Sequence, residues 1–337
     1  MRKLITVLFL GIVAVATLYV ALRHSTTSQR PLPNIAQIKV ELTIERLEQT
    51  LFSLHDKEAI RTFLKDNPTF TTQFLGVTTA NIEEKLVERL YAMIKDPNIQ
   101  PLYQEVQRVF GDCSAIRQQL TTAFRHLKYY YPDFKVPQIA TFITGMGTDL
   151  YVSEDLIVIG LDFFIGEGAK FRPIRLPEYL LRGYQPAHIV PKTVLLLSQQ
   201  FIKTHDSDST LLADMLYYGK AYYFAQALLP QVEASTLLDY TPEQLAEVEQ
   251  HQDIIWEHFI ERKLLYNTNH LIKNKYLSNR PFVAEIGPRC PGHIGRWLGW
   301  EIIKKYMKQH TEVSLPILMN EPDTQKLFTQ SKYRPRK

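Results

Sequence analysis

The chain has 337 residues, of which 45% are hydrophobic, so it can bury a sizeable core in one large domain or two small ones. Lysine and arginine number 39 against 35 aspartate and glutamate, and the resulting net charge of +4 is spread thinly along the sequence. The sequence holds no basic stripe interleaved with aromatic residues, which argues against nucleic acid as a partner.

The N-terminus has the pattern of an export signal. Arg2 and Lys3 precede an uncharged apolar run at residues 4–22, and Arg23 and His24 follow it. A spanning helix needs about 20 apolar residues, so the length favours a retained membrane anchor, with cleavage after residue 16 as the open alternative. Residues 25–34 are small, polar and proline-containing, which predicts an extended linker. We therefore divide the chain into a signal or anchor (1–24), a linker (25–34) and an exported domain (35–334).

The first third of the exported domain is predicted to be mainly helical. Alternating apolar residues predict a strand at 38–42, and the spacing becomes helical at 45–54. Further helices are predicted at 57–64, 81–94, 102–110 and 114–128, with punctuating Asp, Asn, Gly or Pro residues between them.

The middle of the chain is predicted to form a small sheet. Runs of β-branched residues at 139–144 and 156–161 are separated by a glycine-rich turn and a short piece near Tyr151, which predicts antiparallel pairing. Helical patterns return at 178–182, 188–203, 210–229, 242–265, 294–310 and 324–331. The expected fold class is therefore α+β, a mostly helical domain with a small antiparallel sheet.

Motifs for known catalytic chemistries are missing from the sequence. A zinc hydrolase helix carries His at i and i+4 with a Glu beside the first, whereas His251 and His258 lie two turns apart. The sequence contains no Gly-x-Ser-x-Gly turn, and the glycines around Met146 are too few for a dinucleotide fingerprint. We therefore expect no catalytic residue, metal or cofactor. Cys113 and Cys290 are left as either a disulfide or two free thiols.

Two helices have glycines at unusual places. Gly219 stands in the middle of the predicted helix 210–229, which costs about 1 kcal/mol against Ala and indicates close approach by another backbone. Gly295 and Gly299 lie one turn apart in the predicted helix 294–310 and would make a flat groove for a crossing helix. Lys220 and Arg296 stand beside these glycines. Both helices suit either core packing or a partner site.

The same helices, with the sheet before them, resemble the gliding motility lipoprotein family GldB of gliding Bacteroidetes. The similar segments span nearly the whole exported domain in order: YVS at 151–153, LIVIGLDFFIG at 156–166, LPEYL at 176–180, IVP at 189–191, GK at 219–220, LLP at 228–230, LLY at 264–266, GRWLGW at 295–300 and SKY at 331–333. We take the following residues from these segments and helices as candidates for contact with a partner: Asp162, Tyr218, Lys220, Arg296, Trp297 and Trp300.

The chain departs from this family in two places. Members carry a lipobox cysteine at the end of the signal, whereas the first cysteine here is Cys113, so the apolar run at 4–22 must provide any anchor. Where the family commonly has Glu before Gly-Lys, this chain has Tyr218, which puts a role for that Glu in doubt.

The family is also distantly similar to predicted zinc peptidases. In that register, Tyr217, Tyr218 and Ala221 stand where the peptidase motif has its first His, its Glu and its second His. The resemblance therefore implies a degenerate zincin-like scaffold without protease chemistry.

Three functions follow as hypotheses. The first is a non-enzymatic envelope component of the gliding machinery, facing the periplasm and tethered to the inner membrane by its N-terminal helix, or cleaved and periplasmic. The second is an active metallopeptidase of zincin ancestry that uses unrecognised ligands such as His188, His205 or His251. The third is a passive periplasmic module that binds peptide or protein.

Overall fold

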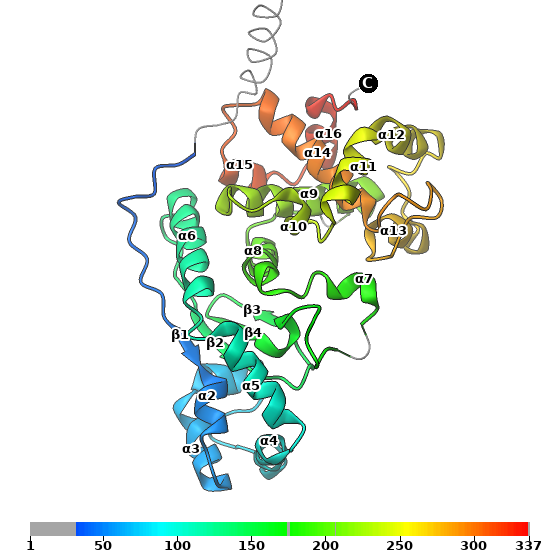
Figure 1. Ribbon diagram of the computed structural model, residues 1–337. Helices are drawn as coiled ribbons and strands as arrows, with labels where there is room; N and C mark the ends of the chain where they lie inside the picture. The colour runs from blue at the N-terminus through cyan, green and yellow to red at the C-terminus, as the bar shows by residue number, and fades with distance from the viewer. Residues whose placement is uncertain (1–31, 174–175, 206, 336–337) are drawn as a thin grey trace, which may run out of the picture.

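The computed structural model describes residues 32–173, 176–205 and 207–335 (Figure 1). It confirms an α+β fold in which helices surround one small sheet. In the first half of the chain, β1 (Ile44–Arg46) leads to helices α2 (Leu47–Phe52), α3 (Lys57–Asp66), a π-helix (Phe70–Phe74), α4 (Glu84–Lys95), α5 (Ile99–Phe110) and α6 (Ser114–Tyr130).

The sheet strands and the helices of the second half follow. The strands are β2 (Gln138–Phe142), β3 (Leu150–Val152) and β4 (Leu156–Gly160). After a 3-10 turn at Leu161–Phe164 come α7 (Glu178–Leu181), a turn at Pro186–His188, α8 (Ile189–Leu197), a turn at Ser198–Gln200, α9 (Leu211–Leu228), α10 (Ala234–Leu237), α11 (Pro242–Gln250), α12 (Gln252–Glu261), α13 (His270–Leu277), α14 (Ile294–Gln309), α15 (Leu315–Asn320) and α16 (Thr324–Ser331).

The sheet is mixed, not purely antiparallel as expected. Its order is β1-β2-β4-β3, with β1 and β4 both parallel to β2, and only β3 antiparallel to β4. The short turn after Val152 can join only antiparallel neighbours, so β3 and β4 form a hairpin. After β2, the chain first crosses to the edge of the sheet, where it forms β3. It then turns back as β4, which lies between β3 and β2 and runs parallel to β2.

The predicted strand at 38–42 is wrong, since β1 begins at Ile44. Apolar alternation makes a strand only where a neighbour supplies hydrogen bonds, and β2 pairs with Ile44–Arg46. The predicted helix 242–265 is two helices that meet at His251, whose backbone (φ −112°, ψ 28°) is not helical. Three helices, α10, α13 and α15, were not predicted. The first and last are only one turn or so long, and the buried residues of α13, Tyr276 and Leu277, are adjacent and do not repeat at a helical period.

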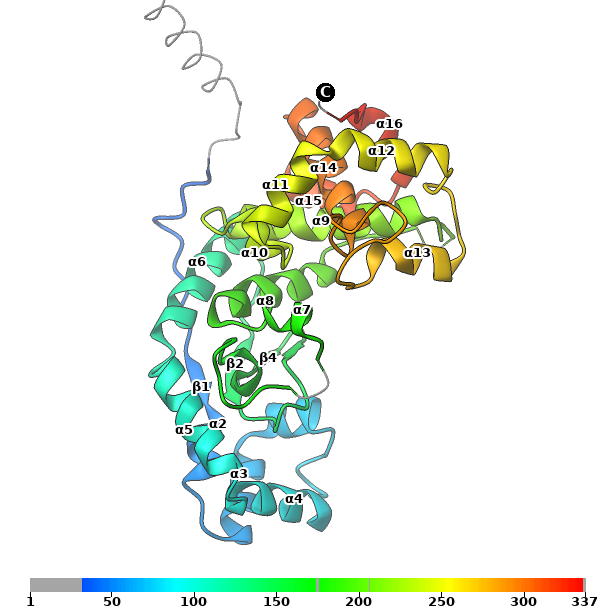
Figure 2. The same cartoon turned by 45° about the vertical axis from the view of Figure 1, so that its right-hand side comes forward.

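The sheet separates two hydrophobic cores. Successive strand residues point to opposite faces, so Ala140, Phe142 and Val158 pack with α2, α3, α4 and the π-helix, whereas Ile139 and Ile157 join the larger core of the remaining helices. Figures 1 and 2 show α3 and α4 at one end of the molecule and α14 to α16 at the other. The described chain starts beside α15 and runs down the molecule to β1 (Figure 1).

The predicted membrane anchor at residues 4–22 lies outside the described residues. Among those described, no helix is both long and apolar enough to cross a bilayer. Cys113 and Cys290 are buried free thiols, so the structure decides the open question of pairing against a disulfide.

Candidate functional site

Helices α9 and α14 cross backbone to backbone. A Cβ added to Gly219 would overlap the carbonyl of Gly299, and one added to Gly299 would overlap the carbonyl of Met215. This confirms the close approach expected from the two glycine positions. The crossing itself leaves no room for a ligand, so any binding site on these helices must lie beside the crossing.

Lys220 points away from solvent and ties two loops together. Its side chain is 4% exposed, and its ammonium donates to the carbonyl of Lys203 at 3.1 Å and to the carbonyl of Glu321. Burial lowers the pKa of Lys220 to about 8. The residue thus joins the segment before α9 to the segment between α15 and α16, which is a structural task.

Because of this burial, we expect stability to rise with pH. Between a folded pKa of about 8 and the ordinary 10.5, the unfolded chain binds more protons than the folded chain. The free energy of unfolding should therefore increase by roughly 1.5 kcal/mol from about pH 8 to about pH 9.5, and Lys220→Met should lack this increase. Urea unfolding at several pH values in this range measures the free energy of unfolding of wild type and variant. Parallel pH profiles for wild type and variant would contradict the expectation.

Tyr218 and Arg296 meet where α9 and α14 approach the surface. The guanidinium carbon of Arg296 lies 4.3 Å from the centre of the Tyr218 ring, a cation–π contact, and both side chains are partly exposed. The same guanidinium lowers the pKa of the buried Tyr222, although burial raises that pKa by more. Nε of Arg296 is buried and has no hydrogen-bond partner among the described residues.

The two tryptophans of α14 belong to the core. Trp297 and Trp300 are each 1% exposed, and the Trp300 ring packs 5.4 Å from that of Tyr222. Lys304 Nζ lies 4.5 Å from the centre of the Trp300 ring. Of the candidates on these two helices, only Tyr218 and Arg296 present surface that a partner could touch.

Asp162 lies elsewhere, at the end of β4, and holds the turn that follows β2. Its carboxylate is fully buried and accepts hydrogen bonds from the backbone N–H of Thr144 at 3.1 Å and of Met146 at 2.6 Å. Burial raises the pKa of Asp162, and the two N–H donors work in the opposite direction. The structure does not bring Asp162 together with the α9 and α14 candidates.

A polar cluster that the sequence did not reveal surrounds Asp239. Its carboxylate accepts a hydrogen bond from Lys192 Nζ at 2.5 Å and lies 3.7 Å from His188 Nε2. Lys192 Nζ also lies 5.3 Å from the centre of the Tyr184 ring. The Tyr184 hydroxyl donates to Asp149 at 2.9 Å. Burial lowers the pKa of His188, so the imidazole is neutral at pH 7. Asp239 has a left-handed backbone (φ 53°), a local feature with no pattern in sequence.

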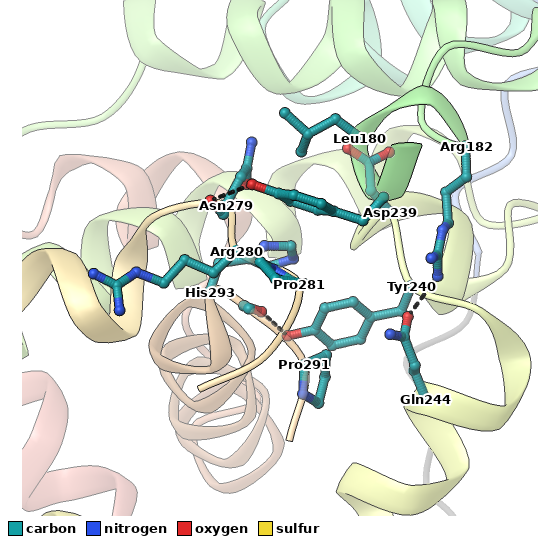
Figure 3. Close-up of a pocket in the computed structure, with 12 residues that line it drawn as sticks. Leu180, Arg182, Asp239, Tyr240, Gln244, Asn279, Arg280, Pro281, Pro291 and His293 are labelled. Carbon is teal, nitrogen blue, oxygen red and sulfur yellow. Dashed lines mark hydrogen bonds between the residues drawn. The ribbon is translucent and has the colours of Figure 1, made fainter. Parts of the chain in front are cut away.

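Asp239 also lines a small pocket, shown in Figure 3. Arg182 donates to Gln244 at 2.9 Å on one side, and the Tyr240 hydroxyl donates to the carbonyl of Gly292 at 2.7 Å across the floor. Arg280 stands at the other side. The volume of about 30 Å³ holds one or two waters, so the pocket admits the tip of one side chain and not a small-molecule substrate.

His293 connects this pocket to α14. Its ring stacks on Tyr240 at 4.8 Å, and its Nε2 meets the carbonyl of Leu238 at 2.8 Å, so this nitrogen carries the proton. Burial lowers the pKa of His293 to about 3.

The histidines considered as unrecognised metal ligands lie in three separate surroundings. His188 faces Asp239, His205 contacts Ser207 in an exposed loop, and His251 contacts Glu247. Within the described part of the chain, no group of three or more His, Cys, Asp or Glu side chains could hold a metal ion.

A protein-family model matches most of the chain. The family model described as gliding motility protein GldB covers residues 28–335. Neither the curated proteins nor the solved structures contain a match to this chain. Because the family match includes the sheet, both glycine-bearing helices and the pocket, the chain belongs to the gliding motility protein GldB family.

Proposed function

We propose that this protein is a non-enzymatic component of the gliding machinery in the cell envelope, held at the inner membrane by residues 4–22. The observation that carries the proposal is the family match over residues 28–335. In this proposal, the exported domain and its N-terminal anchor form a component of the gliding machinery that transmits or organises force at the membrane. Its partners are envelope proteins of the same machinery.

The local structure of α9 supports a role without catalysis. The positions that would hold a peptidase's ligands and base carry Tyr217, Tyr218 and Ala221, and α14 packs directly on this helix at Gly219. Tyrosine and alanine at these places supply neither a neutral imidazole for zinc nor a carboxylate to activate water. The resemblance to zinc peptidases therefore concerns the scaffold in this proposal.

The pocket beside α14 is the proposed point of contact with a protein partner. Arg182 and Arg280 line it, and neither forms a salt bridge in the part of the chain that the structure describes. Asp239, the acidic residue of the lining, is already paired with Lys192. The free positive charge and the small volume suit one acidic side chain of a partner, and Tyr218 with Arg296 extends the surface nearby.

Deletion and complementation in the source organism test this proposal. Deleting the gene should abolish surface spreading, and wild-type protein should restore it. Arg280→Glu should reduce spreading at least tenfold because it puts like charge against the acidic group of the partner. Lys85→Glu is the matched control, since Lys85 is exposed on α4 at the far end of the molecule and the charge change is the same.

Immunoblots should show equal amounts of all three proteins, so that a folding defect is not mistaken for lost binding. Unchanged spreading in the deletion strain would refute the motility role. Stoichiometric zinc in the purified protein would instead revive the metallopeptidase hypothesis, and full spreading with Arg280→Glu would remove the pocket from the partner site.

A further inference from the structure

A groove of about 1060 Å³ lies at the end of the molecule opposite α3 and α4. Its walls come from the C-terminal half of α9, the exposed side of α14, the start of α15 and the end of α6. Leu32 and Pro33, the first described residues, also line it, as do Tyr333 and Arg334 near the other end of the chain. Both ends of the described chain therefore meet at this groove.

The groove is positively charged. Four cationic and two anionic side chains are among the described residues that line it. Lys304 is paired with Glu301 at 2.5 Å. Lys305, Lys308 and Arg334 are exposed and form no salt bridge with any residue that the structure describes. Four cations against two anions leave the lining with an excess of two positive charges, which attracts an anionic partner.

Apolar side chains stand exposed around the same groove. Leu32 is 67% exposed and Tyr129 is 49% exposed, and both line it. Ile317, next to the lining residue Pro316, is 55% exposed. Aromatic and aliphatic side chains beside lysines and arginines are the combination found where proteins meet a bilayer surface.

The distance along the chain places this groove near the proposed anchor. Only residues 23–31 separate the apolar run at 4–22 from Leu32, and nine residues span at most about 32 Å. The groove is therefore within about one bilayer thickness of the membrane surface, whereas α3 and α4 lie at the far end of the molecule.

We propose that this groove docks on anionic phospholipid headgroups of the membrane that carries the anchor. The proposal rests on the envelope location in the proposed function and adds an orientation: α14 and α15 face the bilayer, and α3 and α4 point away from it. Docking fixes the orientation of the domain on the membrane, because an anchor and a basic surface together bind far better than either alone.

A fluorescent probe in the groove tests this with the full chain. Thr311, which is exposed and lines the groove, is changed to Cys and labelled with an environment-sensitive dye. Native Cys113 and Cys290 should not compete, since both are buried and burial raises their pKa values to about 11 and about 12. The labelled protein is inserted into vesicles of phosphatidylcholine alone or with 30% phosphatidylglycerol. A second protein, labelled at Lys85→Cys on α4, reports whether the end of the molecule opposite the groove contacts the membrane.

The probe at residue 311 should shift to the blue only in vesicles with phosphatidylglycerol, and 1 M salt should reverse the shift. Lys305→Glu/Lys308→Glu should abolish it, whereas the matched change Lys65→Glu/Lys85→Glu should leave it intact. The proposal would be overturned if the probe signal is equal in vesicles with and without phosphatidylglycerol. It would also be overturned if the shift persists in the variant Lys305→Glu/Lys308→Glu.

Lys305→Glu/Lys308→Glu could abolish spreading in cells and yet leave the fluorescence shift with phosphatidylglycerol unchanged. In that case the groove binds a protein partner, and membrane docking is refuted. Failure of the motility role gives another result. Spreading would then persist in the deletion strain, while the purified protein would still show the fluorescence shift with phosphatidylglycerol.

Discussion

Replacing Gly299 by Ala should destabilise the protein by at least about 3 kcal/mol, the upper part of the range for overpacked cores. The new Cβ would overlap the carbonyl oxygen and carbon of Met215 on α9, and a backbone atom cannot rotate out of the way as a side chain can. Ala is otherwise the better helix former by about 1 kcal/mol, so the local helix effect has the opposite sign. Chemical denaturation followed by circular dichroism measures the loss.

Gly168→Ala is the matched control for this prediction. No atom lies within 4 Å of a Cβ added to Gly168, so the same substitution should change stability by less than about 0.5 kcal/mol. If Gly299→Ala is as stable as wild type, α9 and α14 do not cross at this residue. The contact between Tyr218 and Arg296, which the crossing brings together, would then be absent as well.

The second large effect is expected at Asp162. Asp162→Ala removes the buried acceptor for the partly buried N–H groups of Thr144 and Met146, and a donor that loses its partner away from water costs about 1–3 kcal/mol. We expect a total loss of roughly 3 kcal/mol and faster amide exchange at Met146, where the turn after β2 loses its support. Denaturation and hydrogen exchange measure these two effects.

Asp162→Asn separates the hydrogen bonds from the volume of the side chain. The amide oxygen can accept one of the two N–H groups, while the amide nitrogen faces the other donor. The loss should therefore be smaller than for Ala but clearly present. Equal stability of all three proteins would show that the turn is held by other contacts.

The placement of the helices was largely predictable. Amphipathic spacing located the long helices α3, α4, α5, α6, α9 and α14 within a few residues, and α16 to the residue. The mid-helix Gly219 also predicted a close backbone neighbour, because a glycine that lowers helix stability is kept where a side chain would not fit. The direction of β4 was not predictable, since periodicity reports which face is buried and not which way a neighbour runs.

The candidate site was predicted less well. Tyr218 and Arg296 do meet, yet Trp297, Trp300 and Lys220 are buried, and Asp162 serves a distant turn. The cluster around Asp239 was missed because its members come from the residue before β3, the segment between α7 and α8, α8 itself and the chain after α10. Each of these residues alone has an ordinary sequence context.

The sequence by itself determined the helical periods, the glycines that permit a close crossing, the apolar run at 4–22 and the resemblance to the GldB family. All of these are properties of consecutive or regularly spaced residues. Only the tertiary structure decided that Lys220 ends on two carbonyls, that the thiols stay apart, and that Lys305, Lys308 and Arg334 share one groove with Leu32. These arrangements depend on contacts between segments up to 300 residues apart, which packing sets and local pattern does not record.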